Sequence, residues 1–176
     1  MSDTGIDPQY LDVFRQWLRS LGDDAAQVGN ALAGAADDEA VRPLIAGLNY
    51  IFQSLDCMTD GIAALGFLDD AFVLRVACAL ARPRETHGVV HRLHEDAHTV
   101  REFLGDDYAR LEKHVRGLAT RAVRGRTVED IAANGAIRTK FLSEVDGWSR
   151  DYEAPPLVRD PKTLVKLRAF LDAKLA

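Results

Sequence analysis

Apolar and polar residues recur at helical spacing, three or four positions apart, along most of this chain. The first such stretch starts at Asp7-Pro8, because aspartate caps free backbone amides and proline suits a first helical turn. We expect Gly22 to end this helix and Asp23-Asp24 to cap an alanine-rich helix that runs to Leu32. The apolar face of the first stretch consists of Tyr10, Phe14, Trp17 and Leu21.

Residues 40–83 are rich in apolar side chains. A helix that starts at Asp37-Asp38 is expected to stop at Gly61. A second helix follows, with the sequence AFVLRVACALA, and ends before Pro83. Asp69-Asp70 precede this sequence and are expected to cap it. The region therefore predicts a central apolar helical hairpin whose two helices are both largely buried.

Residues 85–150 predict a longer helical second half. One apolar seam runs through residues 85–124, and Gly105 is expected to break or kink it. Residues 127–130 have the spacing of a capping box at the start of a further helix. After a Pro-Pro linker, residues 160–175 predict a last amphipathic helix at the C-terminus.

The composition agrees with an all-α protein. The chain has 176 residues, 47% of them apolar and 28% charged, which is enough for one domain with a core of its own. Runs of β-branched residues, which favour strands, are missing. We therefore expect a single all-α domain, residues 1–176, of about six to eight helices.

The sequence also bears on the cellular compartment. The N-terminus, MSDTGIDPQY, is acidic and polar, so we expect no secretory signal. No apolar run reaches the roughly 20 residues that a membrane-spanning helix needs. Cys57 and Cys78 lie in apolar helical sequence and are expected to be buried free thiols. Together these features favour a cytoplasmic protein.

Asp56 and Asp60 are the least expected polar residues of the hairpin. They share one helix face in a last helical turn, where the helix dipole disfavours anions by about 0.3–1 kcal/mol. An arginine, a histidine, the amide-rich start of a facing helix or a metal ion must therefore compensate them. Arg75 is the first candidate, which gives a structural polar centre of Asp56, Asp60, Asp69, Asp70 and Arg75. The alternative is a divalent metal ion held by Asp56, Asp60 and Asp70.

Four histidines form a second polar pattern. They are spaced four, three and four residues apart, along one stripe of a helix that borders the apolar seam. Edge packing or hydrogen bonding is one interpretation. Metal binding, with Glu95 and Asp96 as further ligands, and a pH-dependent contact surface are the alternatives. The histidines of this stripe are His87, His91, His94 and His98.

Charge is distributed unevenly along the chain. The net charge is −5, yet residues 1–70 hold twelve acids and three bases, and residues 110–140 hold eight bases and three acids. We expect the two regions to attract each other within the fold. The basic zone Arg116–Arg126 also precedes a segment with the length and glycine turn of a helix-turn-helix. Binding of nucleic acid or of an anionic surface is therefore an alternative.

The stretch LDCMTDGIAALGFLDD, with its flanks at residues 40–83, resembles the YkvA-like family, a bacterial and archaeal helical domain of unknown function. The family pattern contains Ile-Asp, a second aspartate, and a closing block Leu-Gly-Tyr-Leu-Asp-Asp. Leu55-Asp56 match the first pair, and Asp60 falls at the second aspartate. Residues 65–70 match the closing block, with Phe67 in place of tyrosine.

This chain departs from the family pattern at its prolines. Ser54, Thr59 and Ala63 stand where the family has proline, which would break the chain between helices. The first helix of the hairpin can therefore run further here. The resemblance implies a helical hairpin with the acidic motif as a shared feature, and it implies no reaction.

The sequence has no pattern typical of a catalytic nucleophile, a phosphate loop or a redox cysteine pair. It favours a non-catalytic helical scaffold or protein-interaction module, with no cofactor expected and with a protein partner or a second copy of itself. The rival hypothesis is a metal-dependent, hydrolase-like enzyme that uses the aspartates or the histidine stripe. The third is a nucleic-acid or anionic-surface binder that acts through Arg116–Arg126.

Overall fold

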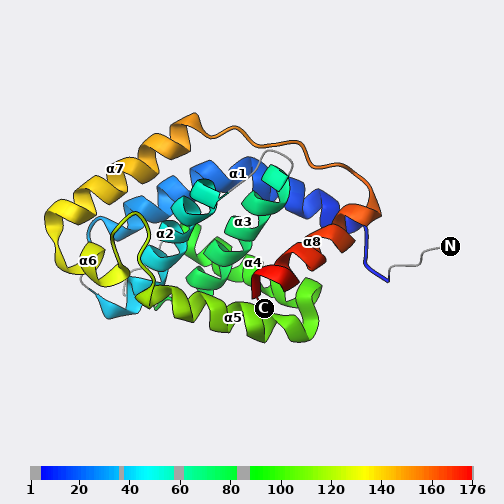
Figure 1. Ribbon diagram of the computed structural model, residues 1–176, viewed down its shortest axis with the longest axis horizontal. Coiled ribbons are helices and arrows are strands. Elements are labelled where there is room, and N and C mark those ends of the chain that lie inside the picture. Colours follow the sequence, from blue (N-terminus) through cyan, green and yellow to red (C-terminus); the bar gives the residue numbers. More distant parts are fainter. Residues whose placement is uncertain (1–4, 36–37, 58–61, 83–87, 176) are drawn as a thin grey trace.

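The computed structural model describes residues 5–35, 38–57, 62–82 and 88–175, the side chains of residues 56 and 57 excepted. Within these ranges the chain is helical and carries no strand, which confirms the predicted all-α domain (Figure 1). The α-helices are α1 (Gln9–Leu32), α2 (Arg42–Cys57), α3 (Ala63–Leu80), α4 (Gly88–Leu104), α5 (Tyr108–Gly117), α6 (Val128–Ala133), α7 (Gly135–Asp151) and α8 (Pro161–Leu175). Short 3-10 turns are η1 (Glu39–Val41), η3 (Gly105–Asp107) and η4 (Leu118–Thr120).

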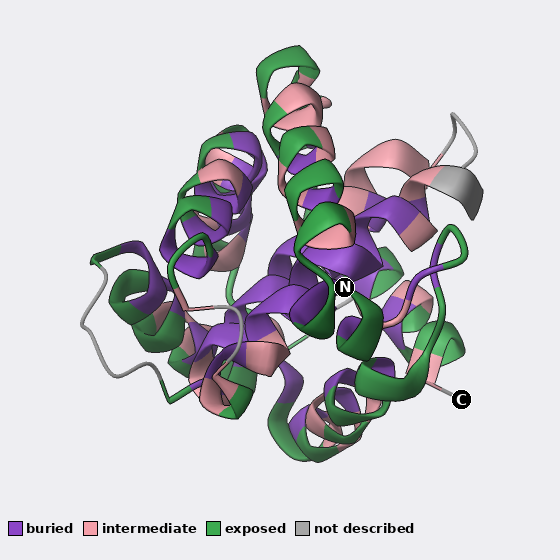
Figure 2. Ribbon diagram, turned by 90° about the vertical axis from the view of Figure 1, so that its left-hand side faces the viewer, coloured by how far each residue is buried: buried purple, intermediate pink, exposed green. Residues whose placement is uncertain are grey.

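Helix α3 lies at the centre of the molecule. Every residue from Leu68 to Cys78 is buried, because α1, α2, α4, α5 and α8 all pack against this helix. A helix enclosed on all sides is apolar all round, which explains the sequence AFVLRVACALA. Buried positions gather in the middle of Figure 2, and the exposed positions lie on the outer helix faces.

Helix α3 begins at Ala63, so Asp69 and Asp70 lie inside the helix and their predicted capping role is wrong. Ile62 occupies the N-cap position and makes no side-chain hydrogen bond there. The helix extends this far because residues 63–70 contain no proline. Gly66 costs only about 1 kcal/mol in a helix, which its buried surroundings can offset.

Helix α1 runs through Gly22 without a break, so the predicted helix end at this residue is also wrong. The Gly22 carbonyl oxygen accepts a hydrogen bond of 2.7 Å from the Ser149 hydroxyl of α7. A Cβ at position 22 would lie 2.9 Å from Cδ1 of the Tyr152 ring. Glycine is therefore present because α1 and α7 approach each other closely, and Asp24 is an interior helix position rather than a cap.

Helices α2 and α3 pack closely against each other. A Cβ added at Gly47 of α2 would lie 2.9 Å from the Cβ of Ala77 in α3. This packing agrees with the expected pair of buried helices. Residues 58–61, which connect the two helices, and Asp37 of the expected helix start lie outside the described residues. The hairpin turn itself therefore stays a prediction.

The second half breaks where the sequence predicts. Gly105 has a φ of +58° and separates α4 from α5, since only glycine adopts this backbone conformation without strain. Thr127 and Asp130 form the predicted capping box at the start of α6. The helical seam ends earlier than expected, because the 3-10 turn η4 stops at Thr120.

The C-terminal part closes the fold. Residues 152–160 form the expected linker, which runs without helix from α7 to α8 in Figure 1. Helix α8 packs against α1, α3 and α5 through Leu164, Leu167 and Leu171. No helix of the described ranges has the length and apolar character needed to cross a bilayer.

Candidate functional site

Arg75 is completely buried on α3 and joins three helices. Its Nε lies 3.1 Å from a carboxylate oxygen of Asp96 on α4, and its Nη2 lies 3.6 Å from Asp24 on α1. Its Nη1 donates a hydrogen bond of 3.1 Å to the Ala71 carbonyl oxygen. The guanidinium carbon lies 4.0 Å from the centre of the Trp17 ring, which is cation–π contact.

Asp24 is the buried anion at the middle of this network. It is 1% exposed and accepts hydrogen bonds from Ser20 and from Arg92 of α4, in addition to the ion pair with Arg75. Burial lowers the pKa of Arg75 to about 10, although the carboxylates of Asp96 and Asp24 oppose that shift. Arg75 therefore stays charged at neutral pH. We call Asp24, Arg75, Arg92 and Asp96 the ion-pair network.

The partners of Arg75 in the described residues differ from those that the sequence suggested. The proposed pairing with Asp70 is wrong, since neither carboxylate oxygen of Asp70 has a hydrogen-bond partner in the described structure. Asp70 and Arg75 are five residues apart on one helix and so point about 140° away from each other. The Asp56 side chain and Asp60 lie outside the described residues, so their contact with Arg75 stays a prediction.

Asp69 and Asp70 form a second buried polar cluster with α2. The Tyr50 hydroxyl donates a hydrogen bond to Asp69, and Tyr50 and Asp69 are 3% and 2% exposed. Burial raises the pKa of Asp69 to about 6, although the Tyr50 hydrogen bond and the charge of Lys174 oppose the shift. The same burial raises the pKa of Tyr50.

Asp70 is the most deeply enclosed acid of this cluster. It is 0% exposed, and burial together with the neighbouring charge of Asp69 raises the pKa of Asp70 well above the ordinary carboxyl value. Ser54 of α2 lies beside Asp70 and favours its charged form, yet the Ser54 hydroxyl makes no hydrogen bond of normal geometry within the described residues. We call Tyr50, Ser54, Asp69 and Asp70 the acidic centre.

His114 of α5, the one histidine outside the stripe, lies against the acidic centre. Its ring meets the Tyr50 ring edge-on, with 5.7 Å between the ring centres. Burial lowers the pKa of His114, and the nearby charges of Arg121 and Lys174 lower it further. His114 is therefore neutral at neutral pH and does not offset the two carboxylates.

The described histidines of the stripe face solvent. His91, His94 and His98 are exposed on α4, so packing at the core edge does not describe them, and His87 lies outside the described residues. His98 Nε2 lies 3.1 Å from the Glu102 carboxylate one turn further along, which is ion-pair distance. Asp96, suggested as a metal ligand, instead faces Arg75.

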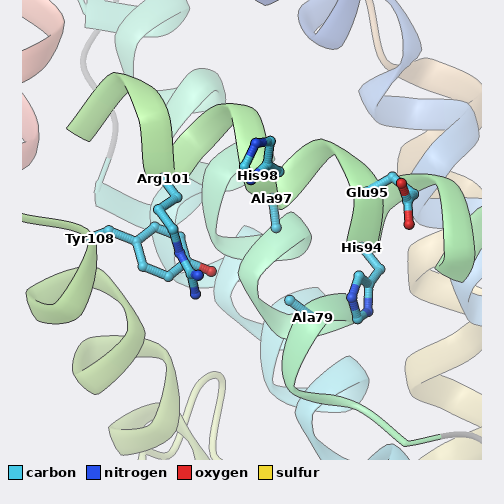
Figure 3. A pocket seen from close by; sticks show the side chains of 7 residues that line it. All are labelled: Ala79, His94, Glu95, Ala97, His98, Arg101 and Tyr108. Atoms are coloured by element: carbon cyan, nitrogen blue, oxygen red, sulfur yellow. The ribbon is translucent and has the colours of Figure 1, made fainter. Parts of the chain in front are cut away.

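Two of these histidines line a surface pocket of about 320 Å³ between α3, α4 and α5. Figure 3 shows Arg101 lying across the Tyr108 ring at one end, with His94 and Glu95 toward the other. The Arg101 guanidinium carbon lies 4.6 Å from the centre of that ring. We call this hollow the α4 pocket; its lining consists of Ala79, His94, Glu95, Ala97, His98, Arg101 and Tyr108.

The predicted metal ligands do not converge in the described part of the chain. There, no three side chains among histidine, cysteine, aspartate and glutamate are placed to hold one metal ion. Asp60 and His87, and the side chain of Asp56, lie outside that part. Cys78 is buried and free, as predicted, and burial raises the pKa of its thiol to about 12. The side chain of Cys57 is not among those described.

The basic zone is partly built into the fold. Arg126 is 8% exposed, forms an ion pair with Glu144, and stacks near the Phe52 and Phe141 rings. Arg116 binds Glu112 one turn before it on α5. These two arginines thus contact acids of their own half of the chain.

Sequence reasoning missed several residues of these sites. Asp24 looked like a cap after Gly22, and Asp96 looked like a metal ligand beside the histidines. Tyr50 gave no signal beyond its place in an apolar helix. For Arg92, the sequence offers no signal other than its position next to the histidine stripe. Comparison with protein-family models, with curated proteins and with solved structures yields no match for this chain.

Proposed function

We propose that this protein is a non-catalytic helical interaction module. One observation carries the proposal: Arg75, Asp69 and Asp70, the charged residues that best resemble catalytic groups, are 0%, 2% and 0% exposed. A catalytic acid or base must reach its substrate. These side chains are better suited to holding α1, α2, α3 and α4 in fixed positions.

The contact surface of the module is the α4 pocket. Arg101 stacks on Tyr108 and has no carboxylate partner within the described ranges. A guanidinium held in this way binds a carboxylate with little further loss of side-chain freedom. The partner is therefore a protein segment that carries an acidic side chain. His94 and His98 line the same pocket on α4.

The test compares Arg101→Glu with Arg150→Glu, which places the same charge change on exposed α7. Partners that cross-link to the wild-type chain are identified, purified and bound to both variants by titration. We expect Arg101→Glu to weaken binding at least tenfold, about 1.4 kcal/mol, and Arg150→Glu to leave it unchanged. Sedimentation of the chain alone shows whether the partner is a second copy.

Two results would overturn the proposal. One is a purified partner that binds both variants equally, since the contact would then lie elsewhere. The other is turnover of a phosphoester or amide panel by the purified chain that is lost in Asp70→Asn but kept in Arg101→Glu. That result would identify the acidic centre as part of an active site.

A further inference from the structure

The acidic centre has a property that the proposed function does not use. Asp69 and Asp70 are adjacent on α3 and are both almost completely enclosed. Asp69 accepts one hydrogen bond, from Tyr50. Neither oxygen of Asp70 has a hydrogen-bond partner in the described structure, and the Ser54 hydroxyl beside it has none there either.

The helices around this pair supply little positive charge. Tyr50 and Ser54 face it from α2, and neutral His114 lies behind Tyr50 on α5. Tyr152 follows α7; burial raises the pKa of Tyr152, and the nearby charge of Asp70 raises it further. Among the described residues, Lys174 of α8 is the nearby cation, and its side chain is exposed. The carboxylates with which α1 and α4 face α3 belong to the ion-pair network, where Arg75 binds them.

Two enclosed carboxylates and one exposed ammonium group are not balanced. An ionised carboxylate without a partner is so unfavourable in a protein interior that it takes up a proton instead. We propose that Asp69 and Asp70 together hold one proton at neutral pH, which makes the packing of α2 on α3 sensitive to pH. The proton lies mainly on Asp70, because Tyr50 donates to Asp69 and so favours its ionised form.

The direction of the pH dependence follows from this arrangement. Burial raises the pKa of both acids above the value of an unfolded aspartate, for Asp69 to about 6 and for Asp70 well above that ordinary value. The folded state therefore binds more protons than the unfolded state above about pH 4. Stability is greatest below that pH as far as these two groups are concerned. It is lost as the pH rises through the folded pKa values.

The experiment measures urea unfolding of the wild type and of Asp70→Asn between pH 7 and pH 9. Asparagine has the shape of the neutral acid but no proton to release. We expect the folding equilibrium constant of the wild type to fall up to tenfold per pH unit relative to that of Asp70→Asn. Asp106→Asn, at an exposed position of η3, serves as the matched control and should follow the wild type.

Parallel curves for the wild type and Asp70→Asn would overturn the proposal. Carbon-13 NMR of the wild-type aspartate carboxyl groups gives a measurement that needs no variant of the centre. One carboxyl signal at pH 7 should have the chemical shift of a protonated acid, and none at that shift would also overturn the proposal. A third contrary result is stabilisation of the wild type, but not of Asp70→Asn, by magnesium, manganese or calcium ions alone. The centre would then hold a cation in place of the proton.

Discussion

Two buried aspartates show how differently one protein interior can accommodate a carboxylate. Asp24 is enclosed by donors and cations: Ser20 and Arg92 donate to it, and Arg75 lies at ion-pair distance. Asp70 has no cation in contact among the described residues, and burial raises its pKa. The difference follows from helix geometry, because the face of α3 toward α1 and α4 carries Arg75, whereas the face toward α2 meets hydroxyl groups.

The ion-pair network makes a residue-scale prediction for Arg75→Met. Methionine fills much of the arginine volume but leaves the Asp24 and Asp96 carboxylates without their shared cation. Breaking a buried ion pair from one side costs about 3–5 kcal/mol, and we expect this loss in the free energy of unfolding measured with urea.

The control for that prediction is the variant in which Asp24 is also neutral. Asp24→Asn combined with Arg75→Met should be less destabilised than the sum of the single variants, because no buried charge remains at position 24. Simple additivity of the two losses would mean that Asp24 and Arg75 do not interact in solution. Arg92→Met, at a half-exposed side chain, should cost less than Arg75→Met.

At the scale of helices, glycine decides how closely the elements approach. Gly22 and Gly47 are enclosed positions where a Cβ would come within 2.9 Å of a neighbouring helix or the residue that follows it. At Gly105, glycine is needed for a different reason, because the backbone there has a positive φ. A glycine read from sequence alone has several meanings, so Gly105 was predicted correctly as a break and Gly22 was not.

The close approach of α1 and α7 predicts opposite effects for two alanine substitutions in one helix. Gly22→Ala should destabilise the protein by about 1–3 kcal/mol, because the new methyl group overlaps the Tyr152 ring and crowds the Ser149 carbonyl oxygen. Gly29→Ala should be neutral or stabilising by up to about 1 kcal/mol. There the nearest atom, Cγ1 of Val145, lies at 3.6 Å, which is ordinary contact.

Thermal or urea unfolding of both alanine variants measures this difference. The two positions share α1 as their helix and α7 as their neighbour, so each variant is the control for the other. Equal stability changes would contradict the interpretation that Gly22 is present for the α1–α7 contact.

At the scale of the whole molecule, local patterns predicted the elements better than their connections in space. The periodicity of apolar residues correctly predicted the helical class, and the capping residues correctly predicted the start of α6. Both signals depend only on residues that are neighbours in the sequence. The partners of Arg75 come from α1 and α4, about 50 and 20 positions away. No rule based on residue spacing predicts contacts between residues that are so far apart in the sequence. The enclosure of Asp69 and Asp70 likewise depends on α2, α5 and α8 meeting around α3.

Helix α8 allows a last prediction about how the parts of the fold depend on one another. Leu167 is 0% exposed, and its helix packs on α1, α3 and α5, so α8 is a wall of the single core rather than an attached arm. Leu167→Ala should then lower the free energy of unfolding of the whole protein by about 2–5 kcal/mol, in one cooperative transition. Val165→Ala, at a residue that is 42% exposed on the same helix, should change the free energy of unfolding by less than about 0.5 kcal/mol.

Hydrogen exchange distinguishes a shared core from a helix α8 that detaches by itself. If the core is shared, the amides of α3 should exchange faster in Leu167→Ala than in the wild type. Faster exchange confined to α8, with the urea midpoint unchanged, would mean that α8 can detach while α3 stays enclosed by the remaining helices.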